Sequence, residues 1–387
     1  ALLVHDYVHM TVTENEFYKT SDDFGYAMEI GSQSTASVSG NKIHGYDTPA
    51  ASDGSGSAGI YIENSFTASS PSIVKSVSLT DNEIYDSQVA LYIGNEFNNY
   101  AGDVDIVVTA TGNYFHNNLE EGVIVTDEDK AGGSSVTYVG SGNTLRDNGD
   151  VGYFVFTRGD GDITVSIDGD TISGHGVGVY LNDYGSVPGG SSYNVDIHNS
   201  SIVNNIDFGV QNAYSGTTLD ATLNWWGSVC SPASVVEGLV DYNPWWGDAA
   251  GTFEVSEGAS GLIIPDGATG PETNAILACV APNSIVDFEA GGTFGGGIVV
   301  STNGLTLNLN GGTVGAGSPA FTINVQAMQR GSEASGWLTA DQAARVQPGM
   351  EVELGTAKGS VLRIEKAAYA TLGDFEVTVQ TVAPIEA

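Results

Sequence analysis

Short runs of acidic residues at predicted turns are the residues of this sequence best suited to chemistry. The runs occupy residues 126–129, 147–150, 160–162 and 168–170. Carboxylate and carbonyl oxygens are the ligands that Ca²⁺ prefers in proteins. We therefore take calcium as the one candidate cofactor, with the candidate ligands Asp127, Asp129, Asp160 and Asp162. No run matches a complete EF-hand loop or the nonapeptide calcium repeat, so solvated turn aspartates explain the same pattern.

The histidines are scattered and show no metal-ligand spacing such as H-E-x-x-H. They are His5, His9, His44, His116, His175 and His198. His175 lies between two glycines, which favours a turn residue over a catalytic one. We assign no catalytic residue from the sequence.

Two interleaved repeats organise the chain that must position these side chains. A polar residue precedes an apolar one by two positions at Asn113, Asn143, Asp170 and Ser200, at intervals of 30, 27 and 30 residues. A small residue leads an alternating apolar run at Gly122, Gly152, Gly178 and Gly209, at intervals of 30, 26 and 31 residues. Two patterns that keep step over this length indicate a repeat protein.

Each repeat predicts two or three short strands bounded by Gly, Asn, Asp and Ser. One repeat cannot bury its apolar face alone, so neighbouring repeats must stack. Propeller blades are longer and need hairpin turns, whereas a coil that rises by one strand spacing, about 4.8 Å, fits this length. Asn at equivalent positions would then form a ladder at a bend. The sequence predicts an all-β parallel β-helix of about seven or eight coils.

These coils resemble the right-handed parallel β-helix repeats of pectate-lyase-like secreted bacterial proteins. Residues 224–227 and 238–246, with their two Trp-Trp pairs, are similar to a motif that closes such domains, and residues 303–313 are similar to a coil that opens another. The resemblance covers about residues 10–325. The resemblance implies the fold and no single function, since lyases, hydrolases, adhesins and structural proteins all share this fold.

The resemblance also implies where an enzyme of this fold would place its catalytic groups. Lyases use a basic residue beside a uronate, for which Arg146 and Arg158 are the only arginines of the coils. Hydrolases use two or three carboxylates, often an adjacent pair, and Asp22-Asp23 is the only adjacent aspartate pair. Turn residues paired with acids explain the arginines equally well, and the aspartate pair lies near the start of the sequence.

Composition restricts the partners. Eleven basic residues stand against 47 acidic ones, which gives a formal charge of −36. Such a charge disfavours nucleic acids and anionic membranes as partners. No stretch approaches the ~20 apolar residues of a membrane span. Together with the fold, the charge predicts an extracellular or cell-surface location.

The sequence has two cysteines, Cys230 and Cys279. In an exported protein they could form a disulfide that staples the Trp-rich segment to the next part of the chain. Two separate buried thiols are the alternative, and the sequence leaves both open. The tryptophans themselves predict an aromatic plug, with a sugar-stacking platform as the alternative.

Changes in composition divide the chain into three parts. We predict a β-helix over residues 1–250, a Gly-rich second β region over 251–325 and a small C-terminal module over 326–387, which is a candidate for assembly. The last part contains a predicted short helix near residues 338–345 and strands near 350–354, 361–364 and 375–379. The first coil shows no capping helix, from which we expect either that preceding coils have been cut away or that this end abuts another chain.

The leading functional hypothesis is an extracellular structural or adhesive protein, a subunit of a fibre or sheath that self-associates through the open N-terminal coil and the C-terminal region. The alternative is a polysaccharide lyase, hydrolase or carbohydrate-binding protein that uses a groove lined by loops. An ice-binding role would require a flat, regular Thr ladder, which the sequence does not show.

Overall fold

The computed structural model describes residues 1–4, 8–20, 23–31, 34–48, 56–63, 73–95, 104–127, 134–159, 161–182, 192–300, 302, 305–314, 321–323, 333–335, 351–353, 360–364 and 378–384. The chain forms two compact units. The first comprises residues 1–227 and 232–242, and the second comprises residues 228–231 and 243–387. The predicted boundary at residue 325 stays a prediction.

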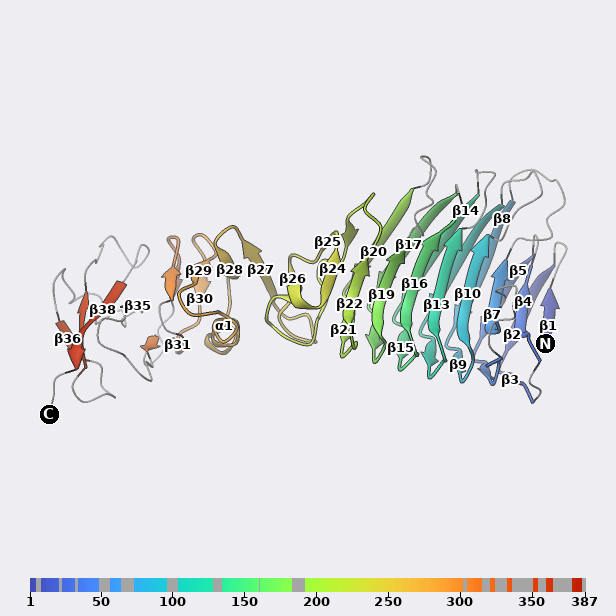
Figure 1. The fold of residues 1–387 in the computed structure, drawn as a ribbon, viewed down its shortest axis with the longest axis horizontal. Coiled ribbons are helices and arrows are strands. Elements are labelled where there is room, and N and C mark those ends of the chain that lie inside the picture. The colour runs from blue at the N-terminus through green and yellow to red at the C-terminus, as the bar shows by residue number, and fades with distance from the viewer. Residues whose placement is uncertain are drawn as a thin grey trace. The chain divides into compact units, whose positions relative to one another are not determined.

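The first unit is a parallel β-helix with three sheets, which confirms the predicted fold class. Sheet A runs along one side (Figure 1) and consists of β1 (Leu2–Val4), β4 (Tyr26–Ile30), β7 (Ala58–Glu63), β10 (Val89–Asn95), β13 (Glu121–Asp127), β16 (Val151–Thr157), β19 (Val177–Asn182), β22 (Phe208–Asn212) and β24 (Val236–Gly238). Each strand pairs in parallel with the strand of the next coil.

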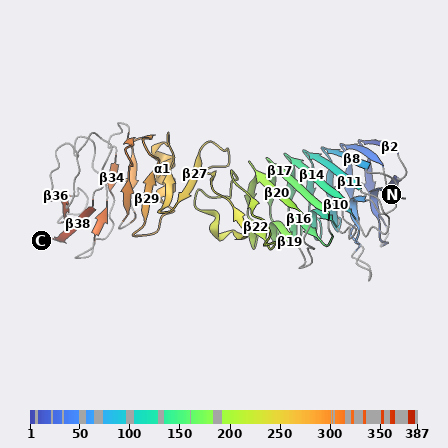
Figure 2. The ribbon, with the colours of Figure 1, turned by 90° about the horizontal axis from the view of Figure 1, so that it is seen from above.

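Sheet B forms a second side, seen from above in Figure 2. It consists of β2 (His9–Thr13), β5 (Thr35–Ser39), β8 (Ile73–Thr80), β11 (Val104–Thr111), β14 (Ser135–Ser141), β17 (Asp162–Asp168), β20 (Tyr193–His198), β23 (Leu219–Asp220) and β25 (Val240–Asp241). Its strands alternate strictly between buried and outward residues, as a sheet with one wet face must.

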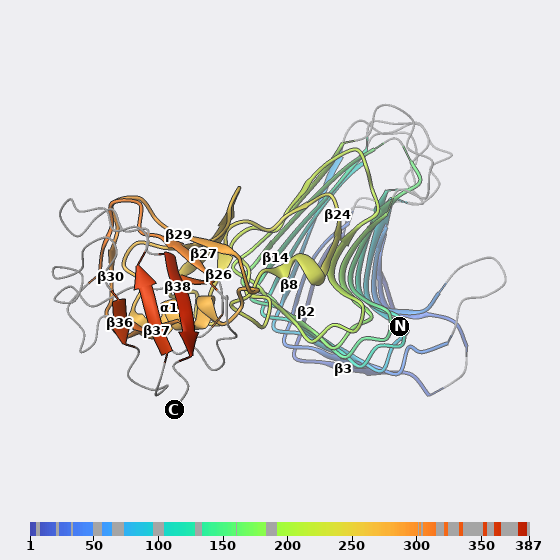
Figure 3. The same ribbon diagram turned by 60° about the vertical axis from the view of Figure 1, so that its left-hand side comes forward.

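Sheet C closes each coil with three-residue strands. It consists of β3 (Glu16–Tyr18), β6 (Lys42–His44), β9 (Glu83–Tyr85), β12 (Tyr114–His116), β15 (Thr144–Arg146), β18 (Thr171–Ser173) and β21 (Ser201–Val203). Seven coils therefore contribute a strand to all three sheets, and the coils lie one behind another in Figure 3.

The predicted Asn ladder lies at the bend between sheets B and C. The side-chain oxygen of each rung accepts a hydrogen bond from the backbone N–H of the rung before it, at 2.7 to 3.0 Å. The rungs are Asn15, Asn41, Asn82, Asn113, Asn143, Asp170, Ser200 and Asn224. Each rung after Asn15 is buried, so the ladder satisfies backbone groups that water cannot reach.

A second ladder, which sequence reasoning missed, lies at the bend between sheets C and A. Its rungs are Ser87, Asn118, Asn148, His175 and Asn205, linked in the same way at 3.1 to 3.2 Å. His175 was interpreted as a turn residue, and it is a buried rung of this ladder.

The repeated glycines follow from the second ladder. A Cβ on Gly152 would lie 2.5 Å from the carbonyl oxygen of Gly178 and 2.9 Å from the ring of His175. A Cβ on Gly122 would lie 2.9 Å from Asn148 Nδ2. At these two positions the glycine therefore leaves space for the backbone and the ladder side chain of the next coil.

The second unit holds shorter parallel pairings and one antiparallel sheet. Its elements are β26 (Trp245–Trp246), β27 (Glu254–Gly258), β28 (Gly261–Ile264), α1 (Gly270–Leu277), β29 (Ile285–Phe288), β30 (Thr293–Phe294), β31 (Ile298–Val300), β32 (Thr306–Asn308), β33 (Thr313–Val314), β34 (Phe321–Ile323), β35 (Glu333–Ser335), β36 (Glu351–Glu353), β37 (Ser360–Ile364) and β38 (Thr378–Pro384). β29 to β31 pair with β32 to β34, which makes two further short coils. The helix predicted near residues 338–345 lies outside the described residues.

Candidate functional site

The outward face of sheet B carries ranks of serine and threonine hydroxyls. One rank runs through Thr11, Ser37, Ser78, Thr109, Val139 and Ser166, and the next through Thr13, Ser39, Thr80, Thr111 and Ser141. A third runs through Ser76, Val107, Thr137 and Thr164. We call these three ranks the hydroxyl face. In-register parallel pairing places like side chains about 4.8 Å apart along the solenoid.

The ranks mix Ser, Thr and Val and are not the regular Thr ladder that the sequence also lacked, but their alignment on one face was missed by the sequence analysis. The residues alternate with buried ones inside each strand, and connections of unequal length hide their alignment. Only the register of the strands brings Ser78 beside Thr109 and Thr137 beside Thr164.

The middle of the hydroxyl face is uncharged. From β5 to β14 its ranks hold Ser, Thr and two valines. The first carboxylates in these ranks are Asp168 in β17 and Asp196 in β20. Asp105 lies at the border of the face, where its Oδ1 accepts a hydrogen bond of 2.7 Å from Ser135 Oγ. In a chain with a charge of −36, these ranks therefore form an uncharged zone on the described part of sheet B.

Sheet C presents a column of stacked rings on its outer face. The ring centroid of Tyr85 lies 4.9 Å from that of His44 and 5.0 Å from that of His116, with nearly parallel planes. Glu16 and Glu83 lie 3.3 and 3.1 Å from the Nε2 atoms of His44 and His116. The nearby Tyr85 also raises the pKa of Lys42, chiefly through a hydrogen bond between their side chains. Each of these glutamates is thus paired with a histidine of the neighbouring coil.

Sheet A has an apolar cluster on its outer face. Buried members include Val89, Ile124, Val151 and Phe154, and half-buried tyrosines pack at its margin. Phe154 stacks on Tyr180 with a centroid distance of 5.3 Å. The cluster is largely covered, so it acts as a second core outside the coil.

Three carboxylates lie at the edge of this cluster, where sheet C leads into sheet A. Glu121 begins β13, and its register partner in β16 is Val151, a member of the apolar cluster. Burial raises the pKa of Glu121 to about 8, and the charges of Glu120 and Asp150 add to the shift. Asp150 donates its backbone N–H to the carbonyl oxygen of Glu120 at 2.8 Å, so the two acids occupy neighbouring coils. A protonated carboxyl beside acids is an arrangement suited to proton transfer.

The structure gives the calcium candidates different surroundings. Asp127 is buried, and its Oδ2 accepts the backbone N–H of Gly161 at 2.8 Å. Asp162 is exposed and its Oδ1 accepts two hydrogen bonds from Ser192. Asp129 and Asp160 lie outside the described residues. Within the described ranges no three acidic, histidine or cysteine side chains form a group that could hold a metal.

The arginines and the aspartate pair do not come together. Arg146 lies on the outer face of sheet C, with its Nε 3.0 Å from Asp147 Oδ2. Arg158 follows β16 of sheet A and lies over the ring of Phe156 at 5.3 Å. Arg146 thus lies on sheet C and Arg158 just beyond a strand of sheet A, because the chain bends from sheet C into sheet A between them. Asp23 is exposed, and Asp22 lies outside the described residues.

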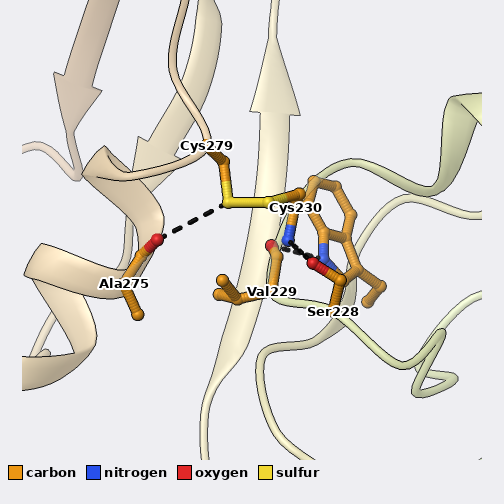
Figure 4. The surroundings of a disulfide bond; sticks show 6 residues. Ser228, Val229, Cys230, Ala275 and Cys279 are labelled. Carbon is orange, nitrogen blue, oxygen red and sulfur yellow. Dashed lines mark hydrogen bonds between the residues drawn. A yellow bond between two sulfur atoms is a disulfide. The ribbon is translucent and has the colours of Figure 1, made fainter. Parts of the chain in front are cut away.

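Cys230 and Cys279 are joined by a disulfide in the second unit (Figure 4). Cys279 follows helix α1, and its sulfur lies 3.5 Å from the carbonyl oxygen of Ala275. Next to the bond, the buried Trp245 donates its Nε1–H to the carbonyl oxygen of Val229 at 3.1 Å. The first unit has its own buried tryptophan, Trp226, whose ring lies against Gly209. Both rings are buried, and the aromatic plug stays a prediction.

Lys75 is a fully buried cation inside the coils. Its Nζ donates hydrogen bonds to the backbone carbonyl oxygens of Ile30 and Glu63. Burial lowers its pKa to about 7, although Glu63 and Glu29 oppose the shift. This lysine is enclosed, so it serves the interior and not a surface site.

A scan against protein-family models finds no match for this chain, and searches of curated proteins and of solved structures find none. In the part of the chain that the structure describes, no helix has the length and apolar character that a membrane span requires.

Proposed function

We propose that the chain is an extracellular adhesive or structural protein that binds a neutral polysaccharide along the hydroxyl face of sheet B. One observation carries the proposal: the uncharged ranks that include Ser78, Thr109 and Thr137 repeat from coil to coil on an otherwise acidic protein. Hydroxyls both donate and accept hydrogen bonds, as sugar hydroxyls do. A polymer that follows the coils repeats the same weak contact at each strand, and such contacts add by multivalency.

Charge favours a neutral polymer over an acidic one. The formal charge of −36 repels uronate chains, whereas the middle of the hydroxyl face adds no repulsion of its own. The disulfide supports an oxidising compartment, as outside the cell. The resemblance of the coils to pectate-lyase-like secreted proteins agrees with this location.

A sedimentation assay with insoluble cellulose and chitin tests the proposal. Thr109→Arg places a long cation in the middle rank, and we expect binding to weaken about tenfold or more because the polymer can no longer lie flat. Thr171→Arg, at an equally exposed threonine on sheet C, is the matched control and should bind as the native protein does. An equal loss of polysaccharide binding in both variants, or native affinity in both, would refute the hydroxyl face as the binding site. Retention of the protein on growing ice without retention on either polysaccharide would reassign the face to ice binding.

A second candidate function rests on the raised pKa of Glu121. A protonated Glu121 with an ionised Asp150 would provide the acid and the base of a glycoside hydrolase. Glu121→Gln should then lower the release of reducing ends about a hundredfold. Glu254→Gln, an exposed glutamate of the second unit, is the control. Absence of any release by the native protein from neutral polysaccharides would dismiss this candidate.

End-to-end self-association, expected from the sequence, stays a prediction. Electron microscopy of the native material with calcium, and again after chelation, tests both the polymer and the role of the metal. Filaments with an axial repeat near one subunit length are the expected result. Isolated particles under both conditions would contradict it.

A further inference from the structure

Both polar ladders of the first unit change to a titratable residue in the same stretch of chain. The first ladder has Asp170 where the preceding rungs have asparagine, and the second has His175. Both side chains are buried, with at most 1% of each residue exposed. Five residues separate them, so one coil presents both to the coil before it.

Asp170 is surrounded by hydrogen-bonding groups and lacks a cation among its contacts in the described structure. Its Oδ1 accepts the backbone N–H of Asn143 at 2.7 Å, and its Oδ2 lies 2.5 Å from Tyr153 Oη. Tyr153 Oη lies 3.2 Å from Tyr138 Oη. Burial raises the pKa of Asp170 to about 6, the Tyr153 and Asn143 hydrogen bonds oppose the shift, and the nearby Asp168 adds to it.

The two tyrosines let the site accept either protonation state. When Asp170 is ionised, Tyr153 donates to the carboxylate and Tyr138 donates to Tyr153. When Asp170 is protonated, its carboxyl O–H can donate to Tyr153 Oη, and Tyr153 can donate to Tyr138 Oη. Gly140 makes room for this pair, because a Cβ there would lie 2.9 Å from the ring of Tyr138.

His175 requires the neutral imidazole. Its Nδ1 accepts the backbone N–H of Asn148 at 3.2 Å, so the proton lies on Nε2, which donates to the carbonyl oxygen of Leu145 at 3.2 Å. Protonation of Nδ1 would remove the acceptor of this rung and turn Nδ1 into a donor, for which the carbonyl oxygen of Asn148 lies 3.3 Å away. Burial lowers the pKa of His175, although its carbonyl partners and Asp147 oppose the shift.

We propose that the coil carrying Asp170 and His175 is a pH-sensitive junction of the solenoid, in which the rung made by Asp170 weakens as pH rises and the rung made by His175 weakens as pH falls. Asp170 ionises inside the coil at the higher pH, and low pH drives His175 to charge. By linkage, a native acid with a raised pKa loses stability as pH rises from its unfolded pKa to its native pKa. A native base with a lowered pKa loses stability as pH falls below its unfolded pKa, so the two contributions oppose each other at mildly acidic pH.

Hydrogen exchange at single ladder amides tests the junction. The informative amides are those of Asn143 and Asn148, which donate to Asp170 and His175, and the amide of Asn82, which donates to Asn113, is the internal control. After correction for intrinsic exchange, we expect protection at Asn143 to fall about tenfold from pH 5 to pH 7.5. Protection at Asn82 should not change in this way.

Variants separate the two halves of the switch. Asp170→Asn should abolish the loss of amide protection at Asn143 above pH 5. His175→Asn should abolish the loss of amide protection at Asn148 in acid. Tyr153→Phe removes a donor to the carboxylate, so it should move the loss at Asn143 to higher pH, and it offers a test if the ladder variants fold poorly. A native profile in which Asn143 follows Asn82 throughout, or an unchanged loss in Asp170→Asn, would overturn the proposal.

Discussion

Asn82 Nδ2 donates a hydrogen bond of 2.9 Å to Asn113 Oδ1, although 31 residues separate them in the chain. The same oxygen accepts the backbone N–H of Asn82 at 3.0 Å. One side chain thus satisfies two donors of the preceding coil, and its own Nδ2 donates to Leu79 and Asn143. Because such bonds lie where water cannot replace them, each rung should matter for stability.

Replacement of one rung tests this point. Asn113→Ala leaves two buried donors of Asn82 without an acceptor, and we expect the free energy of unfolding to fall by about 2–4 kcal/mol. Urea unfolding followed by circular dichroism measures the change. Asn194→Ala, at an exposed asparagine of sheet B, should cost less than about 0.5 kcal/mol. A similar cost at both positions would contradict a special role for the ladder.

The glycine repeat makes a second prediction. In Gly152→Ala the added methyl lies 2.5 Å from the carbonyl oxygen of Gly178 and 2.9 Å from the ring of His175, so the two coils must separate. We expect the free energy of unfolding to fall by about 2–4 kcal/mol. Gly25→Ala is the matched control, since no atom lies within 4 Å of an added Cβ there. Thermal unfolding compares the two. A stable Gly152→Ala protein would show that the interior at this bend is loosely packed.

Lys75 gives the interior a measurable pH dependence. Its native pKa of about 7 lies below the ordinary value of 10.5, so the unfolded chain binds more protons between these values and stability rises with pH there. We expect a gain of about 2 kcal/mol from pH 7 to pH 9. Lys75→Met should abolish this gain, whatever its effect on stability at pH 7. Urea unfolding at both pH values measures this gain in stability. An unchanged gain in the variant would assign the pH dependence to another group.

The disulfide should stabilise the second unit against unfolding. The bond joins residues 49 apart, and its loss should cost about 2–4 kcal/mol, chiefly because the unfolded chain gains freedom. Calorimetry with and without a thiol reductant measures the effect. A Cys230→Ser/Cys279→Ser protein supplies the control, because its unfolding should not respond to the reductant. A native protein that unfolds identically in both conditions would contradict the prediction.

The amino-acid sequence by itself determined the coil and the places where it bends. Asn113, Asn143 and Asp170 recur at the spacing of one coil. Only the stacking of coils can supply hydrogen-bond partners for their buried amide and carboxyl groups. Gly122 and Gly152 marked the start of sheet A strands, although the reason for a glycine there lies in the contacts with the next coil. Local chemistry thus sufficed for the first ladder, the strand pattern and the parallel architecture.

Tertiary structure decided what the faces of the solenoid present. Ser78 and Thr109 are 31 residues apart, and nothing but strand register places them side by side on a neutral face. The same holds for His175, which a local pattern placed in a turn and stacking placed in a ladder. Arg146 and Arg158 are close in sequence yet lie on different sheets, because the chain changes direction at each bend. Repetition can be found in one dimension, but contacts between coils depend on the length of every connection, which sequence pattern does not fix.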